Sequence, residues 1–265
     1  MAKIRLPFPV RAISLIFHDV ADGPSQSLSA AVYTMTQESF LAHLSAMEQR
    51  NPAVGTIRQF FTWQIDMPVF LTFDDGGVSG YTYVGAALER HHWRGHFFIT
   101  TNWIGRSGYM NKQQIRELHS RGHVIGSHSR SHPERMSCLS MQELLTEWKA
   151  SCTILSDVIG KPIRVASVAG GYYSCKVAVA AAQAGIEVLF NSEPITTAAV
   201  VDGCLVLGRY SIQRHTDPGV SGSIAACQLW HRWYQYGLWN SKKAVKTIAG
   251  ESYIALRRRL LSGRL

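Results

Sequence analysis

Charged residues are scarce in this sequence. They make up 17% of the 265 residues, below the usual share of about 25%. The apolar share of 46% is ordinary for a globular protein, so the chain can bury a large core and disorder is excluded as its main state. The sequence also lacks internal repeats and low-complexity linkers. A single domain is therefore the simpler interpretation of its length.

Long apolar runs are lacking as well. The most apolar stretch, residues 178–190, contains Gln183 and Glu187, whereas a membrane-spanning helix needs about 20 apolar residues. The apolar run near the N-terminus, residues 13–17, is too short for the core of a signal peptide. We therefore expect no transmembrane segment and a cytoplasmic protein.

Cysteine is present but lacks a pattern. The five cysteines are widely spaced and form no CxxC pair, which excludes a disulfide framework and a zinc ribbon. We expect them to be small core residues in a reducing compartment.

Acidic residues are outnumbered by basic ones. Lys and Arg total 27 against 18 Asp and Glu, a formal charge of +9, and this excess favours anionic partners. Residues 241–265 contain seven basic residues and one acid, together with an apolar side that includes Ile254 and Leu260. This segment suits either a solvated terminal helix or a helix in peripheral contact with an anionic membrane at its inner face. A nucleic-acid partner is not expected because no recognisable nucleic-acid motif occurs.

Short apolar runs alternate with helical patterns along most of the chain, which is typical of βα units around a mainly parallel sheet. We expect strands at residues 13–17, 68–73, 95–100, 123–127, 164–168, 187–190 and 205–212. Helices are expected at 39–49, 84–91, 112–121, 140–160 and 177–184, and the chain beyond about residue 220 reads as helical with an aromatic cluster at 230–239. In such folds the chemistry lies at the C-terminal ends of the strands.

Two of these strand ends carry clusters of polar residues. Residues 72–76 read TFDDG, and two adjacent carboxylates after a buried strand are costly unless their charge is compensated. Taken alone, Asp-Asp-Gly is equally good turn chemistry. Residues 128–133 read HSRSHP, so His128 and His132 can converge on one point if the segment turns helically. Taken alone, this pair also suits two ordinary surface histidines in a chain with 11.

Together the two clusters indicate a metal site. One carboxylate and two imidazoles with open positions are the arrangement of catalytic rather than structural zinc. The second carboxylate is then free to act as a base toward water that the metal activates. These donors suit Zn²⁺, with Co²⁺, Ni²⁺ or Fe²⁺ as alternatives.

With TFDDG followed by HSxxH, the chain resembles the polysaccharide deacetylases, also called carbohydrate esterase family 4 or the NodB-homology domain. Residues 16–20, IFHDV, are similar to the Tyr-His-x-Val near the start of many members. The resemblance covers approximately residues 11–215. It implies an α/β fold, a distorted (β/α)7 barrel over residues 1–215, and we expect residues 216–265 to form a helical C-terminal extension packed on or near the same domain.

The resemblance also implies roles for the four motif residues. The catalytic base falls on Asp74, and the metal ligands fall on Asp75, His128 and His132. The implied reaction removes acetate from an N-acetylated sugar or glycan, and a cytoplasmic protein suggests a nucleotide- or lipid-linked precursor. Two alternatives stay open: a non-catalytic carbohydrate-binding relative, and a hydrolase of a non-sugar amide. The retained Asp74 argues against the first, because a binding site needs no base beside its metal.

Further family motifs match only in part. His215 is the nearest candidate for the general acid, although its surroundings differ from the motif. Arg164 is a loose candidate for the arginine that tunes the base in many members.

Several residues are candidates for substrate binding. Gly170, Gly171 and Tyr172 belong to a partly matched motif, and an amide near Gly170 could help to hold an oxyanion. The alternative is a strand-to-helix turn that needs glycine. Trp103 is a candidate for stacking on a sugar ring, and His18 is a further candidate.

Overall fold

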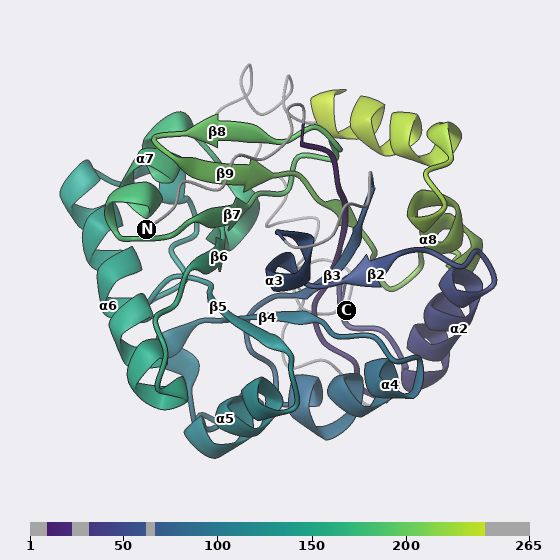
Figure 1. Ribbon diagram of the computed structural model, residues 1–265, viewed down its shortest axis with the longest axis horizontal. Helices are drawn as coiled ribbons and strands as arrows, with labels where there is room; N and C mark the ends of the chain where they lie inside the picture. The colour runs from purple at the N-terminus through teal and green to yellow at the C-terminus, as the bar shows by residue number, and fades with distance from the viewer. Residues whose placement is uncertain (1–9, 23–31, 62–66, 242–265) are drawn as a thin grey trace, which may run out of the picture.

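The computed structural model describes residues 10–22, 32–61 and 67–241. The predicted α/β architecture is confirmed: one curved sheet of mainly parallel strands is surrounded by helices (Figure 1). The strand order is β10-β1-β3-β4-β5-β6-β7-β9-β8, with β2 paired to β3. Only β8 runs antiparallel to its neighbour among the named strands of the described part.

The strands are β1 (Ile13–Phe17), β2 (Val54–Gly55), β3 (Val69–Phe73), β4 (His96–Ile99), β5 (Val124–Ser127), β6 (Val165–Ser167), β7 (Val188–Phe190), β8 (Ala199–Val201), β9 (Cys204–Leu207) and β10 (Tyr210–Ser211). The helices are α2 (Gln37–Glu48), α3 (Ile57–Phe60), α4 (Gly85–Arg90), α5 (Lys112–Ser120), α6 (Met141–Ile159), α7 (Cys175–Gln183) and α8 (Pro218–Ala225). A π-helix, Gly80–Val84, leads into α4, and residues 229–241 are helical. The sequence did not predict β2, α3 or β8.

The central strands are apolar on both faces. Every residue of β1 and β3 is buried, as expected where helices and core cover both sides of a parallel sheet. Phe73 stacks between Phe17 and Phe97, with ring centroids 5.5 and 5.0 Å away. This packing fixes the register in which Phe17 lies opposite Phe73, and it sets the strand ends that follow.

Capping residues set the helix ends where the sequence predicted them. The Asn111 side chain accepts from the backbone N–H of Gln114 at the start of α5, and Ser140 does the same for Glu143 at the start of α6. Both pairs are reciprocal capping boxes, which satisfy backbone donors that a helix N-terminus leaves free. Helix α6 ends at Gly160, which adopts the left-handed conformation (φ +69°).

The predicted single strand over 205–212 is wrong, because the structure breaks it at Gly208 and Arg209. Strand β9 pairs with β7, whereas β10 pairs with β1 at the other end of the strand order. Only these two residues separate β9 from β10, so the sheet must curve round until its ends meet. A Cβ on Gly208 would lie 2.3 Å from the carbonyl oxygen of Glu193, so glycine is required for this crossing.

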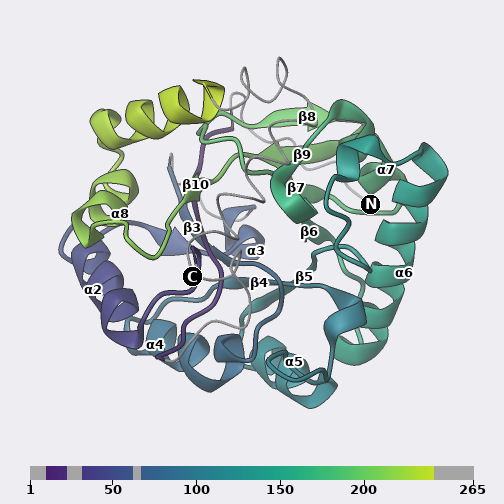
Figure 2. The same ribbon diagram turned by 180° about the vertical axis from the view of Figure 1, so that it is seen from behind.

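The first part of the predicted C-terminal extension packs on the barrel. A Cβ on Gly222 in α8 would lie 2.5 Å from the carbonyl oxygen of Ala46 in α2, and His43 Nδ1 lies 2.9 Å from Ser221 Oγ. Figure 2 shows residues 229–241 continuing beyond α8 along the outer edge of the molecule. The basic part of the extension, residues 242–265, lies outside the described residues, and the boundary at residue 215 stays a prediction.

Within the described ranges, no helix combines the length and apolar character needed to cross a membrane.

Candidate active site

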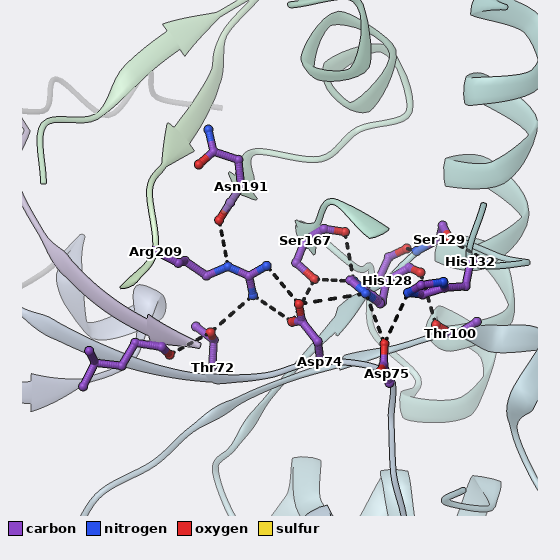
Figure 3. Close-up of polar contacts among 12 residues, drawn as sticks. Thr72, Asp74, Asp75, Thr100, His128, Ser129, His132, Ser167, Asn191 and Arg209 are labelled. Atoms are coloured by element: carbon purple, nitrogen blue, oxygen red, sulfur yellow. Dashed lines mark hydrogen bonds and ion pairs between the residues drawn. The ribbon is translucent and has the colours of Figure 1, made fainter. Parts of the chain in front are cut away.

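The three predicted metal ligands lie together at the C-terminal ends of neighbouring strands. Asp75 follows β3, and His128 and His132 follow β5 (Figure 3). Asp75 Oδ1 lies 3.3 Å from His128 Nε2 and 3.4 Å from His132 Nε2. One ligand atom from each of the three side chains lies within 4.8 Å of the others. The two motifs therefore meet in space.

Left-handed backbone conformations produce this convergence. The φ angles of Asp75, Ser129 and His132 are +74°, +67° and +57°, values that side-chain-bearing residues seldom adopt. The predicted helical turn between His128 and His132 is absent from this described segment. Instead, Ser129 Oγ accepts from the backbone N–H of His132 at 3.0 Å and holds a sharp loop. Strain of this kind is typical of functional sites.

A serine orients His128. Its Nδ1 lies 2.6 Å from Ser167 Oγ, and that hydroxyl lies 3.2 Å from Asp74 Oδ1, with the hydroxyl as donor. Because a carboxylate only accepts, the hydroxyl donates to Asp74 and accepts from His128 Nδ1–H. The tautomer that results leaves Nε2 unprotonated and turned toward Asp75, as a metal ligand requires.

His132 and Asp75 are electrostatically linked. Burial lowers the pKa of His132, but the adjacent Asp75 carboxylate outweighs burial and raises it. Burial raises the pKa of Asp75, but the adjacent His128 and His132 side chains outweigh burial and hold it well below its usual value. The indole of Trp103 stacks on His132 with ring centroids 5.0 Å apart. Trp103 therefore borders the cluster as its place in the sequence suggested, and its contact with sugar stays a prediction.

Asp74 lies beside the cluster and is paired with a buried arginine. Arg209 donates from Nη1 to Asp74 Oδ1 at 2.7 Å and from Nη2 to Oδ2 at 2.9 Å. The guanidinium also donates to the carbonyl oxygen of Asn191 at 2.8 Å and to Thr72 Oγ1 at 3.3 Å. Burial raises the pKa of Asp74, but Arg209 outweighs burial and lowers it. Asp74 is therefore an ionised carboxylate, with Oδ2 3.9 Å from His128 Nε2.

Sequence reasoning missed Arg209 and chose Arg164 as the partner of the base. Arg164 instead forms an ion pair with Glu187 at 3.3 Å, and both side chains are exposed. The sequence contains one signal for Arg209, which interrupts an apolar run that begins at Cys204. Because burying a charge is costly without a partner, an arginine at this position indicates a buried carboxylate beside it.

His18 lies close to Asp74, whereas His215 does not. His18 follows β1 directly, and the backbone N–H of Asp74 donates to the carbonyl of the preceding Phe17 at 3.2 Å. The His18 ring packs on Tyr33 at 4.4 Å, and its buried Nδ1 has no hydrogen-bond partner among the described residues. Burial lowers the pKa of His18, while the charges of Asp75 and Asp74 act in the opposite direction.

His215 lies in an exposed turn beyond the end of β10. No hydrogen bond or ion pair joins it to the cluster within the described part of the chain. The prediction followed motif order along the sequence, but the chain turns outward after Ile212, which is the last buried residue there.

The glycine motif has a structural explanation. Ala169–Gly171 form a short 3₁₀ turn after β6. Gly170 has a φ of +67°, and a Cβ there would lie 2.4 Å from the carbonyl oxygen of Glu134. Tyr172 receives the guanidinium of Arg135 over its ring at 5.1 Å. The contacts of the turn account for the glycine, and substrate binding by Gly170, Gly171 and Tyr172 stays a prediction.

The donor set fits a divalent metal ion. Asp75, His128 and His132 offer one carboxylate and two imidazoles to one point, which is the facial set of catalytic sites with open positions. Ser167 supplies the supporting hydrogen bond that metal-ligating histidines normally have.

Comparisons with known proteins agree with this geometry. The family model described as "Polysaccharide deacetylase" matches residues 65–189. The "Putative polysaccharide deacetylase YxkH" of Bacillus subtilis (strain 168) is 24% identical over 229 residues, which cover 84% of this chain and 77% of that protein. The "Peptidoglycan-N-acetylmuramic acid deacetylase PdaA" of the same organism is 37% identical over 67 residues, 25% of this chain and 24% of that protein.

A solved structure shows the same fold. The Streptococcus pyogenes deacetylase PplD in complex with acetate has a TM-score of 0.69 and 19% identity to this chain, and the match covers 79% of this chain and 96% of that one. Together with the family model, the motifs and the site geometry, the comparisons give one conclusion. Residues 65–189 of this chain match the polysaccharide deacetylase family model, and the chain has the fold of a solved deacetylase.

Proposed function

We propose that this protein is a metal-dependent deacetylase that hydrolyses the acetamide of an N-acetylated sugar and releases acetate. The match to the family model supports a deacetylase that acts on an N-acetylated sugar. The finer proposal rests on one observation: Asp75, His128 and His132 converge, while the adjacent Asp74 is held apart from them by Arg209.

Asp75, His128 and His132 would hold the ion. Their donor atoms suit Zn²⁺ best, with Co²⁺, Ni²⁺ or Fe²⁺ as alternatives. When bound, such an ion lowers the pKa of water and polarises a carbonyl oxygen.

Asp74 is the proposed general base. A carboxylate has about four acceptor positions; Arg209 uses one on each oxygen, and Ser167 uses a second on Oδ1. Oδ2 keeps an acceptor position, and His128 Nε2 lies 3.9 Å from it. Because Arg209 keeps Asp74 ionised, the carboxylate can accept the proton of an attacking water molecule beside the cluster.

His18 is the proposed general acid, in place of His215. It lies next to Asp74 at the end of β1, and its buried Nδ1 has no partner in the described chain. A histidine in this position can take up the proton that Asp74 accepts from water and pass it to the departing amine, so that acetate and a free amine result. The exposed position of His215 supports the change of assignment.

The test is acetate release from metal-stripped protein and from protein reloaded with Zn²⁺ or Co²⁺. N-acetylglucosamine oligosaccharides, peptidoglycan fragments and nucleotide-linked sugars form the panel; peptidoglycan is included because PdaA is named for it. We expect Asp74→Asn to retain the metal and lose about 10²- to 10⁴-fold in turnover. His18→Gln should also lose turnover, whereas the matched control His215→Gln should not.

Two results would overturn the proposal. Carbohydrate binding without acetate release by the reloaded wild-type protein would identify a binding relative. Hydrolysis confined to non-sugar amides would identify a different substrate class. A cytoplasmic location and a nucleotide- or lipid-linked substrate are part of the proposal, and a fusion reporter that shows export would contradict them.

A further inference from the structure

The helical segment 229–241 exposes an unusual amount of aromatic surface. Trp230 and Trp233 are 76% and 66% exposed, and Tyr234 is 58% exposed. Leu229, Tyr236 and Leu238 are exposed as well, whereas Val200 is the one large exposed hydrophobic residue elsewhere in the described ranges. We call these six residues of the helix the aromatic face. Large exposed apolar side chains that gather on one helix in this way mark an interaction site.

The helix is turned with its polar side toward the protein. Arg232 donates to the Tyr210 hydroxyl at 3.2 Å and to Thr196 Oγ1 at 3.1 Å. Gln235 accepts from the backbone N–H of Ser211 and donates to its carbonyl, each at 3.1 Å. At about 100° per residue, Arg232 and Gln235 lie opposite the aromatic face. Normal packing would bury the aromatic side, so this orientation needs a partner for that side.

The sequence that carries the aromatic face contains positive charges only. It has no acidic residue between Asp217 and Glu251, while Lys242, Lys243 and Lys246 follow residue 241 in the sequence. Figures 1 and 2 place the helix at the outer edge of the molecule, beside α8. Tryptophan and tyrosine next to lysine are the composition that proteins use at the boundary between lipid headgroups and acyl chains.

We propose that the aromatic face docks on an anionic phospholipid surface, and that the positive charge of the sequence that follows favours anionic headgroups. Trp230, Trp233 and Tyr234 enter the interfacial layer with their rings, while Arg232 and Gln235 keep the helix fixed to the barrel. A second copy of the chain is the alternative occupant, because a twofold contact would bring each subunit's patch against the same patch, and the test below therefore includes the oligomeric state. The inference does not depend on the deacetylase activity.

The test is flotation of the full-length protein with two kinds of vesicle: pure phosphatidylcholine, and phosphatidylcholine with 30% phosphatidylglycerol (about one lipid in three, enough for an anionic surface). We expect the wild-type protein to bind the anionic vesicles, and more weakly at high salt. The triple variant Trp230→Gln, Trp233→Gln, Tyr234→Gln should lose at least about tenfold in affinity for them. The matched control Val200→Gln removes an exposed hydrophobic residue outside the helix and should bind like wild type.

A second variant tests the charges. Lys242→Gln, Lys243→Gln, Lys246→Gln should lose on the order of a hundredfold on anionic vesicles and nothing on neutral ones. Circular dichroism and the midpoint of thermal unfolding check that each variant is folded. The proposal is overturned if the wild-type protein floats with neither vesicle, or if the aromatic variant binds like wild type. It is also overturned if sedimentation shows a wild-type dimer that the aromatic variant abolishes while vesicles bind neither protein.

Discussion

Replacing Arg209 with methionine should destabilise the fold strongly, because it leaves the Asp74 carboxylate buried and unpaired. Arg209 is 1% exposed and Asp74 is 5% exposed, and two hydrogen bonds of 2.7 and 2.9 Å join them. Removing one partner of such a pair costs about 3–5 kcal/mol. At about 2–4 °C per kcal/mol for a domain of this size, the midpoint of thermal unfolding should fall by roughly 6–20 °C.

Urea unfolding of a double-mutant cycle measures the pair itself. Arg209→Met leaves a buried carboxylate, Asp74→Asn leaves a buried guanidinium, and the double variant leaves neither charge. We therefore expect the double variant to be more stable than the sum of the single losses predicts, with a coupling of about 1–3 kcal/mol. The control Arg164→Met breaks an exposed pair with Glu187 and should cost no more than about 1 kcal/mol. The reasoning would be refuted if Arg209→Met were as stable as this control. It would also be refuted if the double variant lost as much free energy of unfolding as the two single variants together.

The remaining predictions concern the metal site, the crossing between β9 and β10, and acid stability. Ser167→Ala should weaken Zn²⁺ binding by about 10- to 100-fold in calorimetry, because His128 loses its orienting partner; unchanged affinity would contradict that role. Gly208→Ala should lower the free energy of unfolding by about 1–3 kcal/mol through the clash with Glu193, and a wild-type urea midpoint would contradict the crossing. Burial lowers the pKa of His43, His96 and His123 to about 4, so between pH 6.5 and 4 the unfolded chain binds protons that the folded chain does not. The free energy of unfolding should therefore be highest above about pH 6.5 and fall by roughly 1.4 kcal/mol per pH unit for each histidine between pH 6.5 and 4. Urea midpoints that do not change with pH in this range would count against the effect.

Most of the fold could be predicted because its signals are local. Buried strands such as β1 and β3 are continuous apolar runs, and α5 and α6 begin at capping residues that the sequence shows directly. The elements that were missed lack such signals. Strand β8 is an exposed edge strand, and β2 has two residues. The break between β9 and β10 was not predicted, because the apolar pattern of residues 205–212 does not indicate that its first part pairs with β7 and its second part with β1.

The site was predictable to the extent that its residues belong to compact motifs. Asp74 with Asp75 and His128 with His132 are each read from a few adjacent positions. Arg209 and Ser167 were missed because their partners lie far away in sequence and depend on the order of strands in the sheet. The assignment of His215 followed position along the chain, whereas His18 is near Asp74 because β1 and β3 are neighbours.

The curvature that brings β10 beside β1 also sets when the site can exist during biosynthesis. Asp74 is synthesised 135 residues before Arg209. Until Arg209 has been added, the Asp74 carboxylate has no positive charge to pair with when it is buried. A nascent chain that ends short of β10 therefore contains both metal-ligand motifs but not the ion pair that keeps Asp74 ionised and in place. The counter-charge of Asp74 is therefore supplied near the end of the barrel sequence, and a copy truncated before Arg209 lacks it.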